Sequence, residues 1–299
     1  MIAVDWGTSS FRAYRLDEGG AILARRESPR GIAGVPAGRF PQVLAEEIGD
    51  WLGGRRETVV LCGMVGSRQG WVEVPYCECP AGAPEIAACL HPVELEGAAA
   101  YIVPGVSGFD TAGVREVMRG EETQVLGALE ALPEEAAVCL PGTHSKWVRV
   151  RRSQIVGFST HFTGETFAVL KAHSLLGRML EDGAPDEAAF LAGVARSAEP
   201  EGLLHHLFGV RAKALFGELS GVGSGEYLSG LLIGHELRNA LAGVRAAPVF
   251  LLGAPGLVAR YALALRALGA EPRALDAESA VNGMKLLARA RGLAGGARG

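Results

Sequence analysis

The chain has 299 residues, of which 48% are hydrophobic and 21% charged, and its formal net charge at pH 7 is −4. These values are ordinary for a folded globular protein, and the length favours two lobes over one hydrophobic core. Lys and Arg are scattered, which argues against binding to DNA, RNA or an anionic membrane. The expected partner is therefore a small molecule.

The start of the chain and its cysteines predict a cytoplasmic protein. Met1 leads directly into apolar residues 2–4 without the features of a secretory signal, and no apolar run is long enough to span a bilayer. The five cysteines are odd in number and lack paired Cys-x-x-Cys spacing. Reduced, mostly buried thiols are expected rather than disulfides or a structural zinc site. Whether the protein forms a homodimer stays open.

The first elements are predicted in the order strand, strand, strand, helix, strand. Apolar residues 2–4 precede a Gly-Thr-Ser-Ser turn, residues 11–16 alternate in polarity, and a Glu-Gly-Gly turn leads into residues 21–28. Apolar side chains recur at helical spacing over residues 40–52, and residues 58–64 form a short apolar run. The pattern predicts a three-stranded meander followed by a helix and a further strand.

The same order returns later in the chain. Strands are predicted over residues 136–140, 145–151 and 154–162, with a helix over residues 164–176. This recurrence indicates an ancient duplication rather than a short-period repeat. The remaining predictions are a strand over residues 248–252 and helices over residues 121–131, 186–198, 202–207, 225–241, 257–268 and 277–291.

A lobe boundary is predicted after residue 108. Two glycines and an aspartate interrupt any regular period within residues 104–111. The predicted lobes are residues 1–108 and 109–299.

The turn after the first strand has the residue types of a site for a metal-bound nucleotide. Asp5 stands at the strand end, and Gly7, Thr8 and Ser9 follow in the turn. Backbone N–H groups and hydroxyls of such a turn can bind phosphate oxygens while the carboxylate faces a metal ion. A polar turn with a capping aspartate explains the same residues equally well.

Two later turns share this character. Gly142 lets the backbone approach a phosphate, Thr143 offers a hydroxyl, and Lys146 is suited to neutralise charge. Gly253 and Gly256 lie between an apolar strand and a helix, where an adenosine could pack. Each turn alone is unremarkable in an α/β protein, but two Gly-Thr hairpins that each open a three-stranded unit favour phosphate binding. Neither a Rossmann fingerprint nor a P-loop occurs.

An Arg-Gly-Glu-Glu turn over residues 119–122 begins a predicted helix. Phosphorylation of an alcohol calls for a carboxylate near the nucleophilic hydroxyl, and either Glu121 or Glu122 is suited to that role. The alternative is that both glutamates only complement the positive end of the helix dipole.

Six sequence blocks, in order along nearly the whole chain, resemble the 2-dehydro-3-deoxygalactonokinase family. They are AVDWGT at 3–8, GMVGS at 63–67 with GW at 70–71 and PY at 75–76, MRGEETQ at 118–124, PGTHSKW at 141–147, TGE at 163–165 and SGLLIG at 229–234. The resemblance implies an α/β, two-lobed actin-like ATPase (ribonuclease H-like) fold, with duplicated β-β-β-α units around an interlobe ATP cleft.

The resemblance also implies site residues and the cofactors ATP and Mg²⁺. It places Asp5, Gly7 and Thr8 in the first phosphate loop, Gly142 and Thr143 in the second, and Gly253 with Gly256 at the adenosine. The Gly120-Glu121 step resembles the Gly-Asp step that precedes the second phosphate loop in glycerol- and xylulose-type kinases. Glu121 is therefore preferred to Glu122 as base, although Glu replaces Asp here.

A sugar-acid substrate needs donors for its carboxylate and keto groups. Ser67 and Arg68 follow a predicted strand, and Arg12 and Arg119 are also available for an anion. Arg68 is equally explained as a solvated loop cation. Glu165 begins a helix and is suited either to orient sugar hydroxyls or to cap that helix.

The predicted reaction transfers the γ-phosphoryl of ATP to the C6 hydroxyl of 2-dehydro-3-deoxy-D-galactonate. Two alternatives stay open: a kinase for another acid sugar, such as 2-dehydro-3-deoxygluconate or an anhydro-amino sugar, and an actin- or Hsp70-like nucleotide switch. The chain has little room for the partner-binding module that such switches usually carry.

Overall fold

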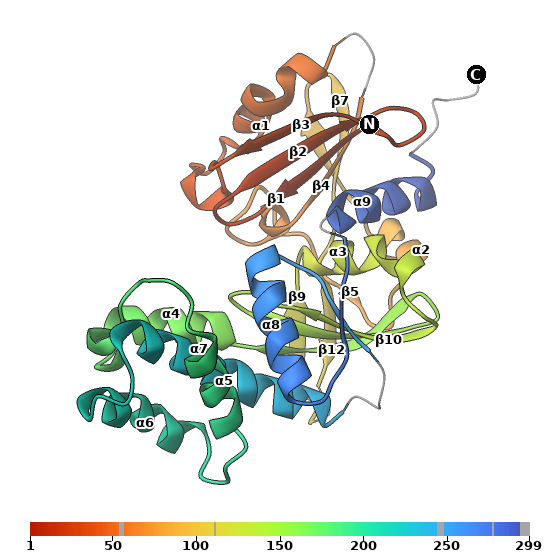
Figure 1. Cartoon of the computed structure of the whole chain (residues 1–299). Helices are drawn as coiled ribbons and strands as arrows, with labels where there is room; N and C mark the ends of the chain where they lie inside the picture. Colours follow the sequence, from red (N-terminus) through yellow and green to blue (C-terminus); the bar gives the residue numbers. More distant parts are fainter. Residues whose placement is uncertain (54–56, 111, 244–247, 277, 294–299) are drawn as a thin grey trace. The chain divides into compact units, whose positions relative to one another are not determined.

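The computed structural model describes residues 1–53, 57–110, 112–243, 248–276 and 278–293 (Figure 1). The chain divides into two compact units. The first unit comprises Met1–Glu135, Val148–Phe158 and Leu275–Gly299, and the second comprises Ala136–Trp147 and Ser159–Ala274.

The predicted boundary after residue 108 lies inside the first unit. It falls within strand β8 (Val106–Phe109), which pairs in parallel with β5 (Cys77–Glu78) and in antiparallel with β9 (Arg115–Met118). The two compact units therefore differ from the two predicted lobes. The reason is that two later segments, Val148–Phe158 and Leu275–Gly299, belong to the first unit.

The other elements are labelled as in Figure 1. The remaining strands are β1 (Ile2–Trp6), β2 (Phe11–Leu16), β3 (Ile22–Ser28), β4 (Glu57–Cys62), β6 (His91–Leu95), β7 (Ala98–Ile102), β10 (Glu135–Leu140), β11 (Ser145–Arg151), β12 (Gln154–His161), β13 (Val249–Leu251) and β14 (Pro272–Ala274). The helices are α1 (Phe40–Ile48), α2 (Ala83–Ala88), α3 (Glu121–Gly127), α4 (Thr163–His173), α5 (Glu187–Arg196), α6 (Leu203–Leu215), α7 (Gly221–Leu241), α8 (Pro255–Ala267) and α9 (Ser279–Ala290).

The first unit is built on a six-stranded sheet of order β3-β2-β1-β4-β7-β6. Ile2, Val4 and Trp6 alternate along β1 and join one core with the apolar face of α1. Helix α9 contacts β1 and β4 and packs tightly on α3. Gly127 makes this close packing feasible, because a Cβ there would lie 1.8 Å from the Ser279 carbonyl oxygen.

A second sheet repeats this topology in the order β12-β11-β10-β13-β14. In the first sheet β1 pairs in parallel with β4, and β4 with β7; in the second, β10 pairs in parallel with β13, and β13 with β14. Both sheets therefore contain a three-stranded meander followed by two parallel strands, and the first sheet adds β6, which is antiparallel to β7. This confirms the predicted actin-like fold with duplicated units.

The helices of the second unit include a group formed by α5, α6 and α7 (Figure 1). Helices α5 and α7 lie so close that a Cβ on Gly193 would be 2.1 Å from the Tyr227 carbonyl oxygen. A Cβ on Gly230 would be 1.9 Å from the Phe190 carbonyl oxygen. Both distances lie far inside van der Waals contact, so these glycines set the separation of the helices.

Replacing Gly230 with alanine is expected to destabilise the second unit. The helices must move apart, at a cost of about 1–3 kcal/mol or more in the free energy of unfolding, as for other overpacked cores. Thermal unfolding followed by circular dichroism measures the loss. Gly225→Ala on the same helix is the control, because the nearest atom to its Cβ would be 3.6 Å away and alanine favours the helix. Equal melting temperatures for Gly230→Ala and wild type would contradict this packing.

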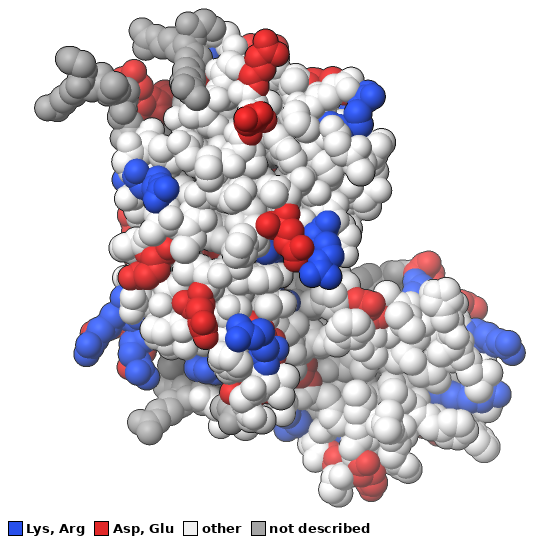
Figure 2. Space-filling view, turned by 180° about the vertical axis from the view of Figure 1, so that it is seen from behind, with Lys and Arg blue, Asp and Glu red and all other residues white. Residues whose placement is uncertain are grey.

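None of the helices in the described part of the chain combines the length and apolar character needed to cross a bilayer. On the face shown in Figure 2, Lys and Arg side chains are interspersed with Asp and Glu. That face therefore presents no extended surface of a single charge.

Candidate active site

Asp5 lies near the end of β1, where the strand gives way to the Gly7–Ser9 turn. Its Oδ2 is 3.9 Å from Nη1 of Arg12, its cross-strand partner, and its Oδ1 is 3.9 Å from Sγ of Cys62. Burial raises the pKa of Asp5, Arg12 opposes the rise, and Glu121 adds to it. Burial also raises the pKa of Cys62 well above its usual range, so the thiol stays protonated and can donate to Asp5. Asp5 is thus a carboxylate in a site that favours an added positive charge.

Two glycines bring the start of α3 against the end of β4. Gly63 (φ +90°) and Gly120 (φ +105°) both have left-handed backbone, and a Cβ on Gly120 would lie 3.2 Å from Cα of Gly63. A Cβ on Gly63 would lie 3.2 Å from Oδ1 of Asp5. The two glycines therefore let the Arg-Gly-Glu-Glu turn approach Asp5, and Glu121 follows directly.

Glu121 and Glu122 occupy different environments although they are adjacent. Glu121 is partly exposed, and its Oε2 accepts a hydrogen bond of 2.9 Å from the Arg119 backbone N–H. Glu122 is fully buried, and its two oxygens accept from the Gly120 N–H and the Thr123 hydroxyl, both at 2.7 Å. Burial, and then the charge of Glu121, raises the pKa of Glu122 from 4.5 to about 7. Of the two predicted bases, only Glu121 has a side chain that solvent, and hence a substrate, can reach.

The raised pKa of Glu122 predicts that the folded protein loses stability as the pH rises. The folded state holds this proton more tightly than the unfolded state, so the free energy of unfolding falls between about pH 4.5 and 7. A shift from 4.5 to about 7 corresponds to about 3 kcal/mol. In Glu122→Gln the amide oxygen can accept from the Gly120 N–H and the amide N–H can donate to the Thr123 hydroxyl. Neither group titrates, so the stability of this variant should vary less over this range. Urea unfolding of both proteins at pH 5 and pH 8 tests this, and identical pH dependence would contradict it.

Arg119 is 9% exposed and lies against the segment that follows Gly66. Its Nη2 donates to the Val74 carbonyl oxygen at 2.7 Å, and its guanidinium lies 4.4 Å from the ring centre of Tyr76. Among the described residues its Nε and Nη1 have no hydrogen-bond partner. These contacts tie the turn before Glu121 to the 74–76 segment, and a substrate contact by Arg119 stays a prediction.

The other predicted substrate residues of the first unit are placed differently. Ser67 is buried, and its hydroxyl is 3.5 Å from Oε1 of Gln69. Arg68 is exposed and pairs with Glu73 at 3.2 Å, as the solvated alternative expects. Arg12 lies beside Asp5 and is also 3.8 Å from Glu27.

The predicted first phosphate loop is a tight turn. The Gly7 N–H donates to the Ser10 carbonyl oxygen at 2.9 Å, and the Thr8 carbonyl oxygen accepts from the Ala33 N–H at 3.0 Å. A Cβ on Gly31 would lie 2.2 Å from the Thr8 oxygen, so only glycine allows this approach. Thr8 and Ser9 are exposed and are therefore accessible to a ligand.

In the second unit, the predicted second phosphate loop and adenosine turn lie together. A Cβ on Gly253 would lie 3.4 Å from the Pro141 carbonyl oxygen, and the Leu252 N–H donates to the Cys139 oxygen at 3.0 Å. Apart from the adjacent residues and, for Gly256, the nearby backbone of α8, no described atom lies within 4 Å of a Cβ built on Gly142 or Gly256. The adjacent strands β10 and β13 thus bring both turns to one edge of their sheet, with open space at each glycine.

Glu165 belongs to the same neighbourhood. Its N–H donates to the Thr143 carbonyl oxygen at 2.9 Å, and its Oε2 is 2.5 Å from Nε2 of His144. The His144 ring stacks on Phe162 with centroids 4.7 Å apart. Lys146 is 5% exposed and donates to the His144 carbonyl oxygen at 3.3 Å; its predicted phosphate contact stays a prediction.

His144 was not predicted from the sequence as a site residue. It follows the Gly-Thr pair directly, and this adjacency is the signal in the sequence that would have identified it. Its partner Glu165 is 21 residues away, so only the structure shows that the two meet.

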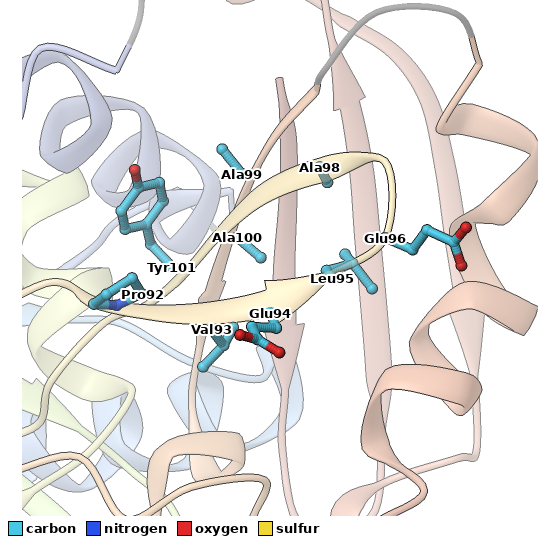
Figure 3. A pocket seen from close by; sticks show the side chains of 9 residues that line it. All are labelled: Pro92, Val93, Glu94, Leu95, Glu96, Ala98, Ala99, Ala100 and Tyr101. Atoms are coloured by element: carbon cyan, nitrogen blue, oxygen red, sulfur yellow. The ribbon is translucent and has the colours of Figure 1, made fainter.

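A hollow in the first unit lies away from the residues discussed so far. It is lined by the β6–β7 hairpin, including Glu94, Glu96 and Tyr101 (Figure 3). No predicted site residue lines it, and its two carboxylates are unsuited to an anionic sugar acid. The carboxylates beside Asp5 and the turns of the second unit are therefore the better candidates.

The chain is similar to proteins of one family over nearly its whole length. A family model for 2-keto-3-deoxy-galactonokinase matches residues 5–286. The 2-dehydro-3-deoxygalactonokinase of Escherichia coli (strain K12) is 38% identical over 295 residues, covering 97% of each chain. A Rhizobium meliloti (strain 1021) protein assigned the same name is 40% identical over 295 residues and 96% of each chain.

A solved structure leads to the same family. The crystal structure of a Sinorhizobium meliloti protein assigned as a 2-dehydro-3-deoxygalactonokinase has 39% identity and a TM-score of 0.89. The match covers 97% of this chain and 98% of that one. The chain therefore belongs to the 2-keto-3-deoxy-galactonokinase family.

Proposed function

We propose that this protein is an ATP-dependent kinase that phosphorylates the C6 hydroxyl of 2-dehydro-3-deoxy-D-galactonate, giving 2-dehydro-3-deoxy-6-phosphogalactonate. Membership of the family supports the reaction and the substrate class. The structural observation that carries the proposal is the placement of Glu121. It is a partly exposed carboxylate at a glycine turn next to Asp5.

Glu121 has the placement expected of the base. A carboxylate that accepts the proton of an attacking hydroxyl must be reachable and held in one orientation. The Arg119 N–H holds one oxygen of Glu121, and Gly120 fixes the direction from which the side chain leaves the turn. Glu122, buried beneath the same turn, supports its shape through the Gly120 N–H.

Asp5 fits a role in holding Mg²⁺. Magnesium usually needs only one or two protein carboxylates, because water and substrate phosphates supply the other ligands. Burial and Glu121 both disfavour an uncompensated charge on Asp5, and a cation would remove that penalty. When bound, Mg²⁺ would neutralise charge on the phosphates of the donor.

The second unit offers groups for the nucleotide. We infer that the backbone of Gly142 and the hydroxyl of exposed Thr143 bind phosphate oxygens, and that the adenosine packs at the Gly253 turn. The open space at Gly142 and Gly256 supports this assignment. In the first unit, exposed Thr8 and Ser9 carry donors of the same kind.

An ATP-dependent phosphorylation screen tests the function. ADP formation is followed with 2-dehydro-3-deoxygalactonate, with 2-dehydro-3-deoxygluconate, with an anhydro-amino sugar and without acceptor, and the product is located by ³¹P–¹H NMR. We expect ADP to form fastest with the first compound and the phosphate to be on C6. Equal ADP formation without acceptor would indicate a nucleotide switch, and preference for another acceptor would overturn the assigned substrate.

A further inference from the structure

The segment that carries the second predicted phosphate loop is fastened to the start of α4 at three points. The Thr143 carbonyl oxygen accepts from the Glu165 N–H at 2.9 Å, and the His144 ring stacks on Phe162. The third point is Gly164, where a Cβ would lie 2.4 Å from the Gly142 carbonyl oxygen. The loop and the first turn of α4 therefore form one rigid arrangement.

Within this arrangement the side chains of His144 and Glu165 pair at 2.5 Å. A carboxylate only accepts hydrogen bonds, so the imidazole must carry a hydrogen on Nε2 and donate it to Oε2. The side chains are 43% and 39% exposed. Exposed pairs of this kind contribute little to the free energy of unfolding. A stabilising role therefore does not explain why His144 and Glu165 are paired.

We propose that His144 is a positioning residue that holds the Glu165 carboxylate for the hydroxyl groups of the sugar acid. The inference rests on the proposed kinase function. Phosphate oxygens of ATP are acceptors and would repel a carboxylate, whereas sugar hydroxyls are donors that match it. His144 donates to one oxygen of Glu165 and restrains the carboxylate, which leaves the other oxygen to accept from a sugar hydroxyl.

This pairing links acceptor recognition to the nucleotide loop. Thr143 and His144 are adjacent in the chain, so the group that positions Glu165 is part of the segment assigned to phosphate binding. Because Glu165 is assigned to the sugar hydroxyls and not to the phosphates, loss of the His144–Glu165 pair should change the apparent affinity for the sugar acid and leave that for ATP little changed.

Kinetics of single and double variants test the proposal. Initial rates are measured for wild type, His144→Ala, His144→Gln, Glu165→Ala and the His144→Ala/Glu165→Ala double variant, varying 2-dehydro-3-deoxygalactonate and ATP in turn. We expect His144→Ala to raise the KM for the sugar acid about tenfold, the typical effect of losing a hydrogen bond to a charged group. The KM for ATP should stay within about twofold. Gln can donate from a similar position, so His144→Gln should recover most of the loss.

The double variant separates positioning from an independent role. If His144 acts only through Glu165, its loss should have no further effect once Glu165 is alanine. Equal effects of His144→Ala in both backgrounds, or an effect on the KM for ATP instead, would overturn the inference while leaving the kinase function intact. Thermal unfolding of each variant controls for folding, and His144→Gln keeps the test decisive if His144→Ala is unstable. Absence of sugar-acid phosphorylation in the wild type would remove the proposed function and this inference together.

Discussion

Glu121→Gln is expected to lower kcat by a factor of about a hundred or more, with a modest change in the KM for the sugar acid. This is the effect of losing general-base assistance while binding is kept. Glutamine has the size of glutamate and can still accept from the Arg119 N–H, so the turn should keep its shape. Steady-state kinetics with 2-dehydro-3-deoxygalactonate measures the change.

Glu122→Gln is the matched comparison, because it makes the same chemical change one residue further on. Successive helical side chains point about 100° apart, and Glu122 is fully buried whereas Glu121 is partly exposed. Its loss of activity should therefore be the smaller of the two. If Glu122→Gln loses most of its activity and Glu121→Gln retains it, the base is Glu122 and not Glu121. If both retain activity, the base lies elsewhere, with Glu165 the first candidate.

Asp5→Asn is expected to bind nucleotide but to lose most of its turnover. The amide keeps the shape of the turn but removes the charge that would hold the metal ion, a loss of several kcal/mol in the transition state. ATP affinity is measured by calorimetry and turnover by coupled assay. Activity within about threefold of wild type would contradict the assignment, because a carboxylate that positions the metal should contribute several kcal/mol to transition-state stabilisation.

The same substitution should not destabilise the fold. Burial raises the pKa of Asp5, so the ionised carboxylate is disfavoured in the folded state and a neutral amide relieves that penalty. We expect an equal or higher melting temperature at pH 8. Asp17→Asn, in the exposed turn after β2, is the control and should leave turnover unchanged.

Local patterns in the sequence were sufficient for the two meanders. Alternation and glycine turns predicted β1 to β3 and β10 to β12, because antiparallel neighbours joined by short turns depend on residues close in sequence. The repetition of the meander, together with the six sequence blocks that resemble the family, predicted the fold. The same patterns predicted that Asp5, Gly142 and Gly253 lie at strand ends.

The region from Cys77 to Met118 was not predicted as regular structure, although it forms β5 to β9 and α2. Strand β7 begins with three alanines, which have weak strand propensity, and its parallel pairing with β4 forms it instead. Strand β14 begins at Pro272 and depends on β13 in the same way. Helix α6 extends to Leu215, beyond the predicted end at residue 207. Such elements depend on distant partners that no local pattern contains.

The chemistry of the site divides along the same line. The sequence by itself determined which residue types stand at the turns, since a glycine, a hydroxyl or a carboxylate at a strand end is a local property. Tertiary packing decided the environment of each side chain: it buried Glu122 and left Glu121 reachable, held Arg119 against Val74, and paired Arg68 with Glu73. It also brought His144 to Glu165 across 21 residues. Burial and charge depend on neighbours from other segments, and only the folded chain brings those segments together.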